Sequence, residues 1–128
     1  MNRTHTQRMG AVLALSLLAS GAAKAELVNI AWNGAGHFEK TVSVNPGKFA
    51  EVCGKLTKGQ VIVWSFTSSA AMNFNIHYHE GKSVVFPSKL DAVAAGEDKL
   101  LVPLDQGYCW MWSNKTDKPV ELKLMLQK

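Results

Sequence analysis

Cysteine is scarce in this 128-residue chain, which holds only Cys53 and Cys109, far apart and without the C-x-x-C spacing of a redox motif. Long apolar runs are missing beyond residue 25, where nothing approaches the roughly 20 apolar residues that a membrane-spanning helix needs. We therefore expect no membrane span after residue 25 and no dithiol redox activity.

Helical patterning and catalytic motifs are missing as well. No stretch after residue 25 keeps the apolar period of about 3.6 residues for three turns, which argues against amphipathic helices. The chain contains no G-x-S-x-G, no H-E-x-x-H and no phosphate-binding glycine loop, so we expect no enzyme. Because the basic residues form no cluster, nucleic acid is not an expected partner.

Residues 1–25 have the pattern of a cleaved secretory signal. Arg3 and Arg8 provide a basic start, a short apolar run follows, and residues 23–25 form an A-x-A-like cleavage site. No cysteine stands at that site to carry a lipid anchor. Three of the 14 Lys and Arg residues lie in this segment, so the rest of the chain is nearly neutral against 10 Asp and Glu. We expect a soluble periplasmic protein in which residues 26–128 form one domain.

The remaining chain has strand patterns separated by turn signals such as Asn45-Pro46-Gly47. About eight strands at regular spacing predict an all-β fold, an antiparallel sandwich of jelly-roll type. Residues 60–67 are apolar on both faces and should form a central strand that is buried on both faces near its middle. Residues 88–98 are predicted to be irregular, with a helical turn at 92–95. The predicted strands cover residues 27–32, 38–44, 49–56, 60–67, 72–81, 83–86, 99–103, 108–113 and 120–126.

The stretch 72–81 combines strand periodicity with metal-ligand chemistry. Phe74, Ile76 and Tyr78 alternate along one face, which should be buried. The other face carries two asparagines and two histidines, Asn73, Asn75, His77 and His79. Two imidazoles two residues apart on a strand are roughly 6 to 7 Å apart at the base, close enough to bind one copper or zinc ion.

Such a site needs further donors, and the sequence offers several. The candidates are Glu80 and His37 as additional ligands, Met72 and Met111 as soft ligands, Trp110 and Trp112 as ring caps for Cu⁺, and Asn73 and Asn75 as partners that orient the imidazoles. The leading hypothesis is therefore a non-enzymatic periplasmic protein that binds copper or zinc through His-x-His.

Each of these features has a second interpretation. The polar face can equally serve as a metal-free patch that recognises a protein or an envelope ligand. Trp110 and Trp112 either pack in the core or form an exposed platform together with Tyr108. In an oxidising compartment Cys53 and Cys109 are expected to form a structural disulfide, and the alternative is that Cys109 binds copper as a thiolate. The oligomeric state is left open.

Three pieces of the chain resemble, in order, the GOLD domain, the luminal β-sandwich of cargo receptors of the early secretory pathway. The pieces are Val52-Cys53 through Lys58-Gly59-Gln60-Val61, Phe74-Asn75-Ile76 followed by Gly81-Lys82, and Gly107-Tyr108-Cys109 through Trp112-Ser113-Asn114. The resemblance covers roughly residues 49–126. It implies a sandwich bridged by its two cysteines and a recognition module rather than an enzyme. His77 and His79 are not part of the family's pattern.

Overall fold

The computed structural model describes residues 26–128 as an all-β fold, which confirms the predicted fold class. The predicted signal peptide, residues 1–25, lies outside the described residues. None of the described residues forms a helix that could cross a membrane. The seven strands are β1 (Glu26–Asn29), β2 (His37–Val44), β3 (Phe49–Leu56), β4 (Val61–Glu80), β5 (Ser83–Leu101), β6 (Gln106–Ser113) and β7 (Val120–Gln127).

Two long strands, β4 and β5, replace four of the predicted segments. The predicted strands 60–67 and 72–81 are parts of β4, which runs for 20 residues. The small residues 68–71 were expected to end a strand. Instead the pairing with β5 is interrupted between Thr67 and Met72 and then resumes, as it does at a β-bulge, so the chain bends without leaving the sheet.

The prediction of an irregular stretch at 88–98 with a helical turn at 92–95 was wrong, because these residues belong to β5. They pair with β4 from Lys89 to Asp98. The local irregularity is a single residue with positive φ, Ala92 at 52°. Its N–H donates to Asn73 Oδ1 at 2.9 Å, which fixes the bend of β5 to that of β4.

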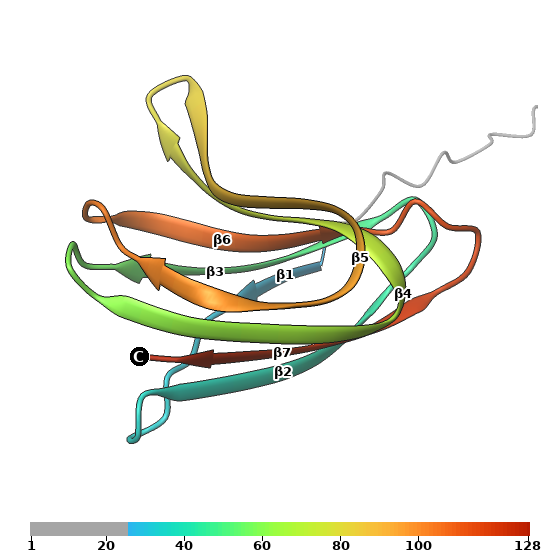
Figure 1. Cartoon of the computed structure of the whole chain (residues 1–128), viewed down its shortest axis with the longest axis horizontal. Coiled ribbons are helices and arrows are strands. Elements are labelled where there is room, and N and C mark those ends of the chain that lie inside the picture. Colours follow the sequence, from blue (N-terminus) through green and yellow to red (C-terminus); the bar gives the residue numbers. More distant parts are fainter. Residues whose placement is uncertain (1–25) are drawn as a thin grey trace, which may run out of the picture.

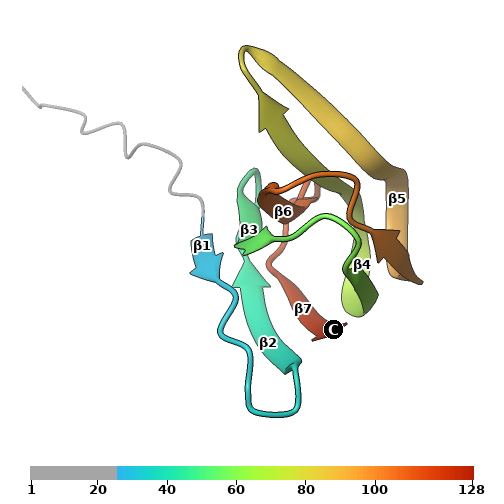
Figure 2. The same cartoon turned by 90° about the vertical axis from the view of Figure 1, so that its left-hand side faces the viewer.

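β4 connects the two sides of the molecule because it changes partner along its length. The strand order is β1-β3-β6-β4-β7-β2, with β5 paired to β4 outside this path. Residues 63–68 of β4 pair with β7, and residues 73–77 pair with β6. The β4–β5 hairpin therefore bends from one side to the other and gives a nearly closed, barrel-like shape (Figures 1 and 2). The sheet is mixed, because β1 runs parallel to β3 whereas all other pairs are antiparallel.

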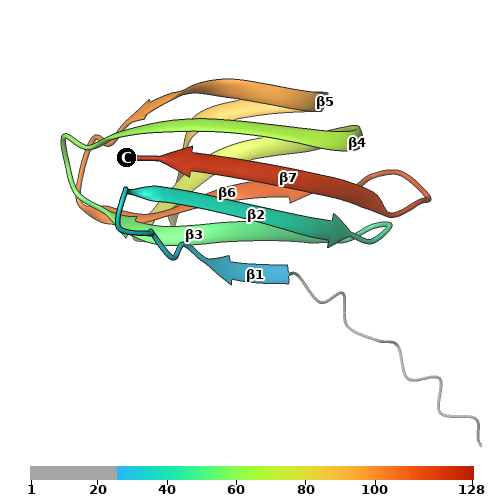
Figure 3. The same cartoon turned by 90° about the horizontal axis from the view of Figure 1, so that it is seen from below.

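The core lies between the two sides of this bent sheet and is rich in aromatic rings. Trp64, Phe66, Phe74 and Trp112 form one cluster, with ring centroids 4.7 to 5.5 Å apart for most pairs. β7 runs alongside β2 and β4 (Figure 3) and buries every second residue, as predicted from its alternation.

Residues 60–67 were predicted to form a central strand buried on both faces, and only the first half of this prediction is confirmed. The corresponding part of β4 has β5 on one side and β7 on the other. Its inner face is buried, but Val61 and Val63 are each 46% exposed on the outer face. The apolar side chains on that face are therefore only partly buried.

The predicted disulfide is confirmed. Cys53 and Cys109 face each other in the β3–β6 pair and are bonded. The alternative in which Cys109 is a copper-binding thiolate is therefore excluded. Because the bond joins directly opposite residues, it also fixes which residues of β3 and β6 lie side by side.

Candidate functional site

The candidate site lies on the outer face of β3, β6 and the second half of β4. Alternation along these strands turns Glu51, Met111 and Asn75 outward, next to each other in the register of the sheet. One step further along, His77 lies opposite Cys109, beside the disulfide. Outward-facing side chains from three strands therefore meet at one place.

The tip of the β4–β5 hairpin forms one side of the candidate site. Figure 1 shows the tip rising away from β6. Val84 is paired with His79 across the hairpin, and the Phe86 ring lies 6.0 Å from the His77 ring. The resulting cleft of about 340 Å³, here called the outer groove, is lined by Glu51, Asn75, His77, His79, Val84, Phe86 and Met111.

His77 is the most enclosed polar group of the outer groove, with 5% of its surface exposed. Its Nδ1 lies 2.7 Å from Asn75 Oδ1, and its Nε2 lies 3.5 Å from Glu51 Oε1. The Asn75 oxygen can only accept a hydrogen bond, so Nδ1 carries the proton of the neutral ring and the lone pair of Nε2 faces the Glu51 carboxylate.

Burial is the main cause that lowers the pKa of His77 below its usual value. The nearby Glu51 carboxylate opposes this shift, and His79 adds to it. The neutral imidazole is therefore favoured near pH 7. Two hydrogen-bond acceptors, Nε2 and Oε1, then face one another across a partly enclosed space with no proton between them. This arrangement favours a ligand that supplies a positive charge or a hydrogen-bond donor.

The structure brings together some of the residues that were singled out in the sequence. His77, His79, Asn75 and Met111 all line the outer groove, and the two histidine rings are 5.4 Å apart. Asn73 lies on the same strand face, but its side chain binds the backbone of Ala92 rather than an imidazole. Of the two asparagines, Asn75 alone holds a histidine.

Two proposed ligands lie elsewhere. His37 is in β2, at one end of the strand order, where it contacts Gln127 and Glu39 rather than His77 or His79. Glu80 is exposed beside the hairpin turn, paired with Ser83, and does not line the outer groove.

The remaining candidates point inward. Met72, Trp110 and Trp112 are buried in the core, on the opposite side of the sheet from His77. In the register of the sheet, Trp110 lies next to Ile76 and Trp112 next to Phe74. The two tryptophans therefore form part of the core and not an exposed platform. Of the four proposed soft ligands and ring caps, Met111 alone faces the histidines.

Sequence reasoning missed Glu51, Val84 and Phe86. Glu51 precedes Cys53 by two residues, so the predicted strand 49–56 already placed both on one face. Combined with a bond between Cys53 and Cys109, that face would have put Glu51 beside Met111. The positions of Val84 and Phe86 had no comparable signal, because they depend on how far the hairpin extends beyond β6.

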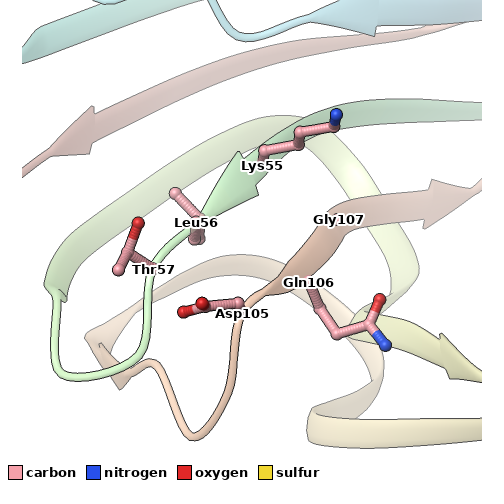
Figure 4. Close-up of a pocket in the computed structure, with 6 residues that line it drawn as sticks. All are labelled: Lys55, Leu56, Thr57, Asp105, Gln106 and Gly107. Atoms are coloured by element: carbon pink, nitrogen blue, oxygen red, sulfur yellow. The ribbon is translucent and has the colours of Figure 1, made fainter.

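A second cleft, of about 400 Å³, lies where β3 ends and β6 begins (Figure 4). Its polar groups hold the two turns together, because Asp105 Oδ1 accepts from the Lys58 N–H at 2.7 Å. Lys55 and Gln106 point away from Asp105. We therefore regard this cleft as part of the turn structure and place the candidate site in the outer groove.

No protein-family model matches the chain, and no curated protein matches it in sequence. Among solved structures it is similar to Aeromonas hydrophila PliG, a periplasmic lysozyme inhibitor of g-type lysozyme, with a TM-score of 0.54 and 16% identity over 83% of this chain and 100% of that one. It is also similar to Salmonella Typhimurium PliG, a periplasmic lysozyme inhibitor of g-type lysozyme, with a TM-score of 0.53 and 13% identity over 80% of this chain and 97% of that one. The pre-peptidase C-terminal domain of a Bacillus anthracis collagenase has a TM-score of 0.58 and 9% identity over 83% of this chain and 97% of that one.

These similarities show a shared fold. They place the chain among small β-rich domains, several of them periplasmic inhibitors rather than enzymes. None of these neighbours is described as a GOLD domain, so the resemblance to that family extends to a β-fold only. The fold and the outer groove together define a disulfide-bridged β-domain with an open surface site.

Proposed function

We propose that the chain is an exported, non-enzymatic protein of the periplasm that binds a protein partner through the outer groove. The main observation in favour of the proposal is that exposed apolar side chains line the outer groove next to partly buried polar ones. Phe86 is 47% exposed and Val84 42% exposed. Beside them, the acceptors of Glu51 and His77 can provide specificity. Aromatic residues, Phe among them, are enriched in protein–protein interfaces relative to the rest of the surface.

Two comparisons support this proposal. The PliG proteins that share the fold are described as periplasmic lysozyme inhibitors, and they span nearly the same length of chain. GOLD domains, which the sequence resembles in three pieces, are recognition modules as well. Both support a binding role without catalysis. The PliG proteins, together with the signal-like residues 1–25, also support a periplasmic location.

A g-type lysozyme is the first partner to test, because it is the enzyme that the PliG neighbours inhibit. We expect residues 26–128 to inhibit this lysozyme saturably in a cell-wall clearing assay. Phe86→Ala should weaken the inhibition about tenfold or more, since truncation of an aromatic hot spot costs about 2 kcal/mol or more. Leu27→Ala is the matched control, because Leu27 is 71% exposed but lies on β1, outside the outer groove.

Two results would count against the proposal. If the protein does not inhibit the lysozyme at concentrations of about 100 μM, corresponding to a binding free energy weaker than about −5.5 kcal/mol, this lysozyme is not the partner. If Phe86→Ala inhibits as well as the unchanged protein while Leu27→Ala does not, the binding surface lies outside the outer groove.

A transition metal, copper or zinc, is a second candidate ligand. The observation in its favour is the 3.5 Å between His77 Nε2 and Glu51 Oε1, two atoms that both bind such ions. The ligand set differs from that expected from the sequence, because His37 and Glu80 do not line the outer groove.

A further inference from the structure

We propose that Glu51, His77 and His79 form a binding site for a divalent transition metal, Zn²⁺ or Cu²⁺, in the outer groove. The proposal deepens the second candidate function and does not depend on a protein partner. It assigns the carboxylate ligand to Glu51 on β3, a residue that the His-x-His pattern alone does not indicate.

The distance between the first two donors fits a metal ion. Zinc bonds to imidazole nitrogen and carboxylate oxygen are about 2.0 to 2.2 Å long, so two ligands of a tetrahedral ion lie about 3.4 Å apart. His77 Nε2 and Glu51 Oε1 are 3.5 Å apart. The separation of these two atoms is therefore that of two ligands of one ion.

The proton of His77 is on the side away from this space. Asn75 Oδ1 accepts from Nδ1 at 2.7 Å, which orients the ring and leaves Nε2 free to bind. A hydrogen bond from the second ring nitrogen to an oxygen is the usual support of a metal-binding histidine. Because the His77 side chain is 7% exposed and the Glu51 side chain 20% exposed, a bound ion would be partly shielded from water.

His79 is the third ligand, and it must turn to bind. Its ring lies 5.4 Å from that of His77, on the same strand face, and the residue is exposed. In the described part of the chain, the only three donors within 4.8 Å of one another are those of Glu51, Cys53 and Cys109, and the two sulfurs are joined. The site is therefore half formed by His77 and Glu51 and completed by His79.

The donor set selects the kind of ion. Two imidazoles and one carboxylate suit Zn²⁺ and Cu²⁺, with Cu²⁺ bound more tightly in the general order of affinities. Met111 lines the same cleft and offers a thioether at the fourth position for copper. Ca²⁺ and Mg²⁺ prefer six or more oxygen ligands, so we expect neither to bind here.

The test is a titration of residues 26–128 with Zn²⁺, followed by calorimetry, and with Co²⁺, followed by its d–d absorption. We expect one saturable site with a dissociation constant below about 10 μM, equivalent to about −6.8 kcal/mol. Glu51→Gln keeps the shape of the side chain and should weaken binding at least tenfold, and so should His79→Ala. The ¹⁵N chemical shift of His77 Nε2 can be followed in a long-range ¹H–¹⁵N correlation spectrum. A change of this shift on addition of Zn²⁺ would identify that atom as a ligand.

Two matched variants serve as controls, His37→Ala and Glu80→Gln, because both change potential ligands that lie outside the outer groove. Both should bind Zn²⁺ like the unchanged protein. The proposal is overturned if the unchanged protein shows no saturable site below about 10 μM for Zn²⁺ or Cu²⁺, or if Glu51→Gln binds normally. It is also overturned if either control weakens binding as much as Glu51→Gln. The lysozyme assay in the presence of EDTA tests the protein-binding proposal separately.

Discussion

Asn114 joins parts of the chain that are distant in sequence, and it is completely buried. Its Nδ2 donates to the carbonyl oxygens of Val44 at 2.9 Å and Lys118 at 2.7 Å. Its Oδ1 accepts from the backbone N–H and the hydroxyl of Thr116. All hydrogen-bonding groups of the side chain are therefore paired, and β2, the end of β6 and the loop before β7 are held together.

We expect Asn114→Ala to destabilise the protein by about 3 kcal/mol or more, because the buried Val44 carbonyl would lose its side-chain partner along with three other hydrogen bonds. Urea unfolding measures the loss. Asn33→Ala is the matched control, since the Asn33 oxygen also accepts two backbone N–H groups but is exposed, where water replaces them. An equal loss in both variants would show that burial of the amide is not the cause.

Among the four polar residues of the outer groove, the sequence predicted three. His77 and His79 were identified from their spacing, and Asn75 from its position on the same face. Glu51 was missed because contact between β3 and β4 is indirect and passes through β6. Only the register of two strand pairs, β3 with β6 and β6 with β4, brings its carboxylate to His77. Side-chain alternation within one strand contains no such information.

At the scale of elements, the β4–β5 hairpin shows where sequence patterns stop being sufficient. The two halves of β4 were predicted as separate strands, because the small residues 68–71 have the composition of a turn. The pattern of Phe74, Ile76 and Tyr78 identified the buried face correctly. It could not reveal that the same strand exchanges β7 for β6 as its neighbour, because the change of partner depends on the bend and on the packing of the aromatic core.

The close packing of this hairpin allows a direct test at Gly96, which lies opposite Phe66. A Cβ atom at position 96 would be 2.7 Å from a carbon of the Phe66 ring and 3.3 Å from the Trp64 ring. We therefore expect Gly96→Ala to cost about 1 to 3 kcal/mol in free energy of unfolding, as overpacking of a core usually does.

Gly107→Ala is the control for this substitution, because a Cβ atom there meets nothing within 4 Å. It lies in β6 and should change the stability by no more than about 1 kcal/mol, with a gain expected from the restricted unfolded chain. Thermal unfolding followed by near-ultraviolet circular dichroism suits the comparison, since it reports the tryptophans that surround Phe66. If Gly96→Ala were as stable as Gly107→Ala, the proposed contact with Phe66 would be wrong.

At the scale of the whole molecule, the outer groove depends on the connection between β3 and the β4–β5 hairpin, which passes through β6. Glu51 lies on β3, next to β1 at one end of the strand order, and the side formed by the hairpin tip lies on β4 and β5. The Cys53–Cys109 bond fixes β3 to β6, and His77 of β4 is paired with Cys109 of β6 in the register of the sheet. The disulfide therefore sets the position of Glu51 relative to His77, and it contributes to the site as well as to the stability of the fold.

The disulfide should account for a large part of that stability. It connects residues that are 56 positions apart, and closing a loop of this length stabilises the folded state by about 4 kcal/mol on the chain-entropy account. A double variant, Cys53→Ala with Cys109→Ala, should therefore unfold at a lower urea concentration than the oxidised protein, and the reduced unchanged protein should behave similarly. The double variant should not respond to dithiothreitol, because the described residues contain no other cysteine. Equal unfolding midpoints for the oxidised and reduced proteins would show that strand pairing alone holds β3 against β6, in which case Glu51 would keep its place without the bond.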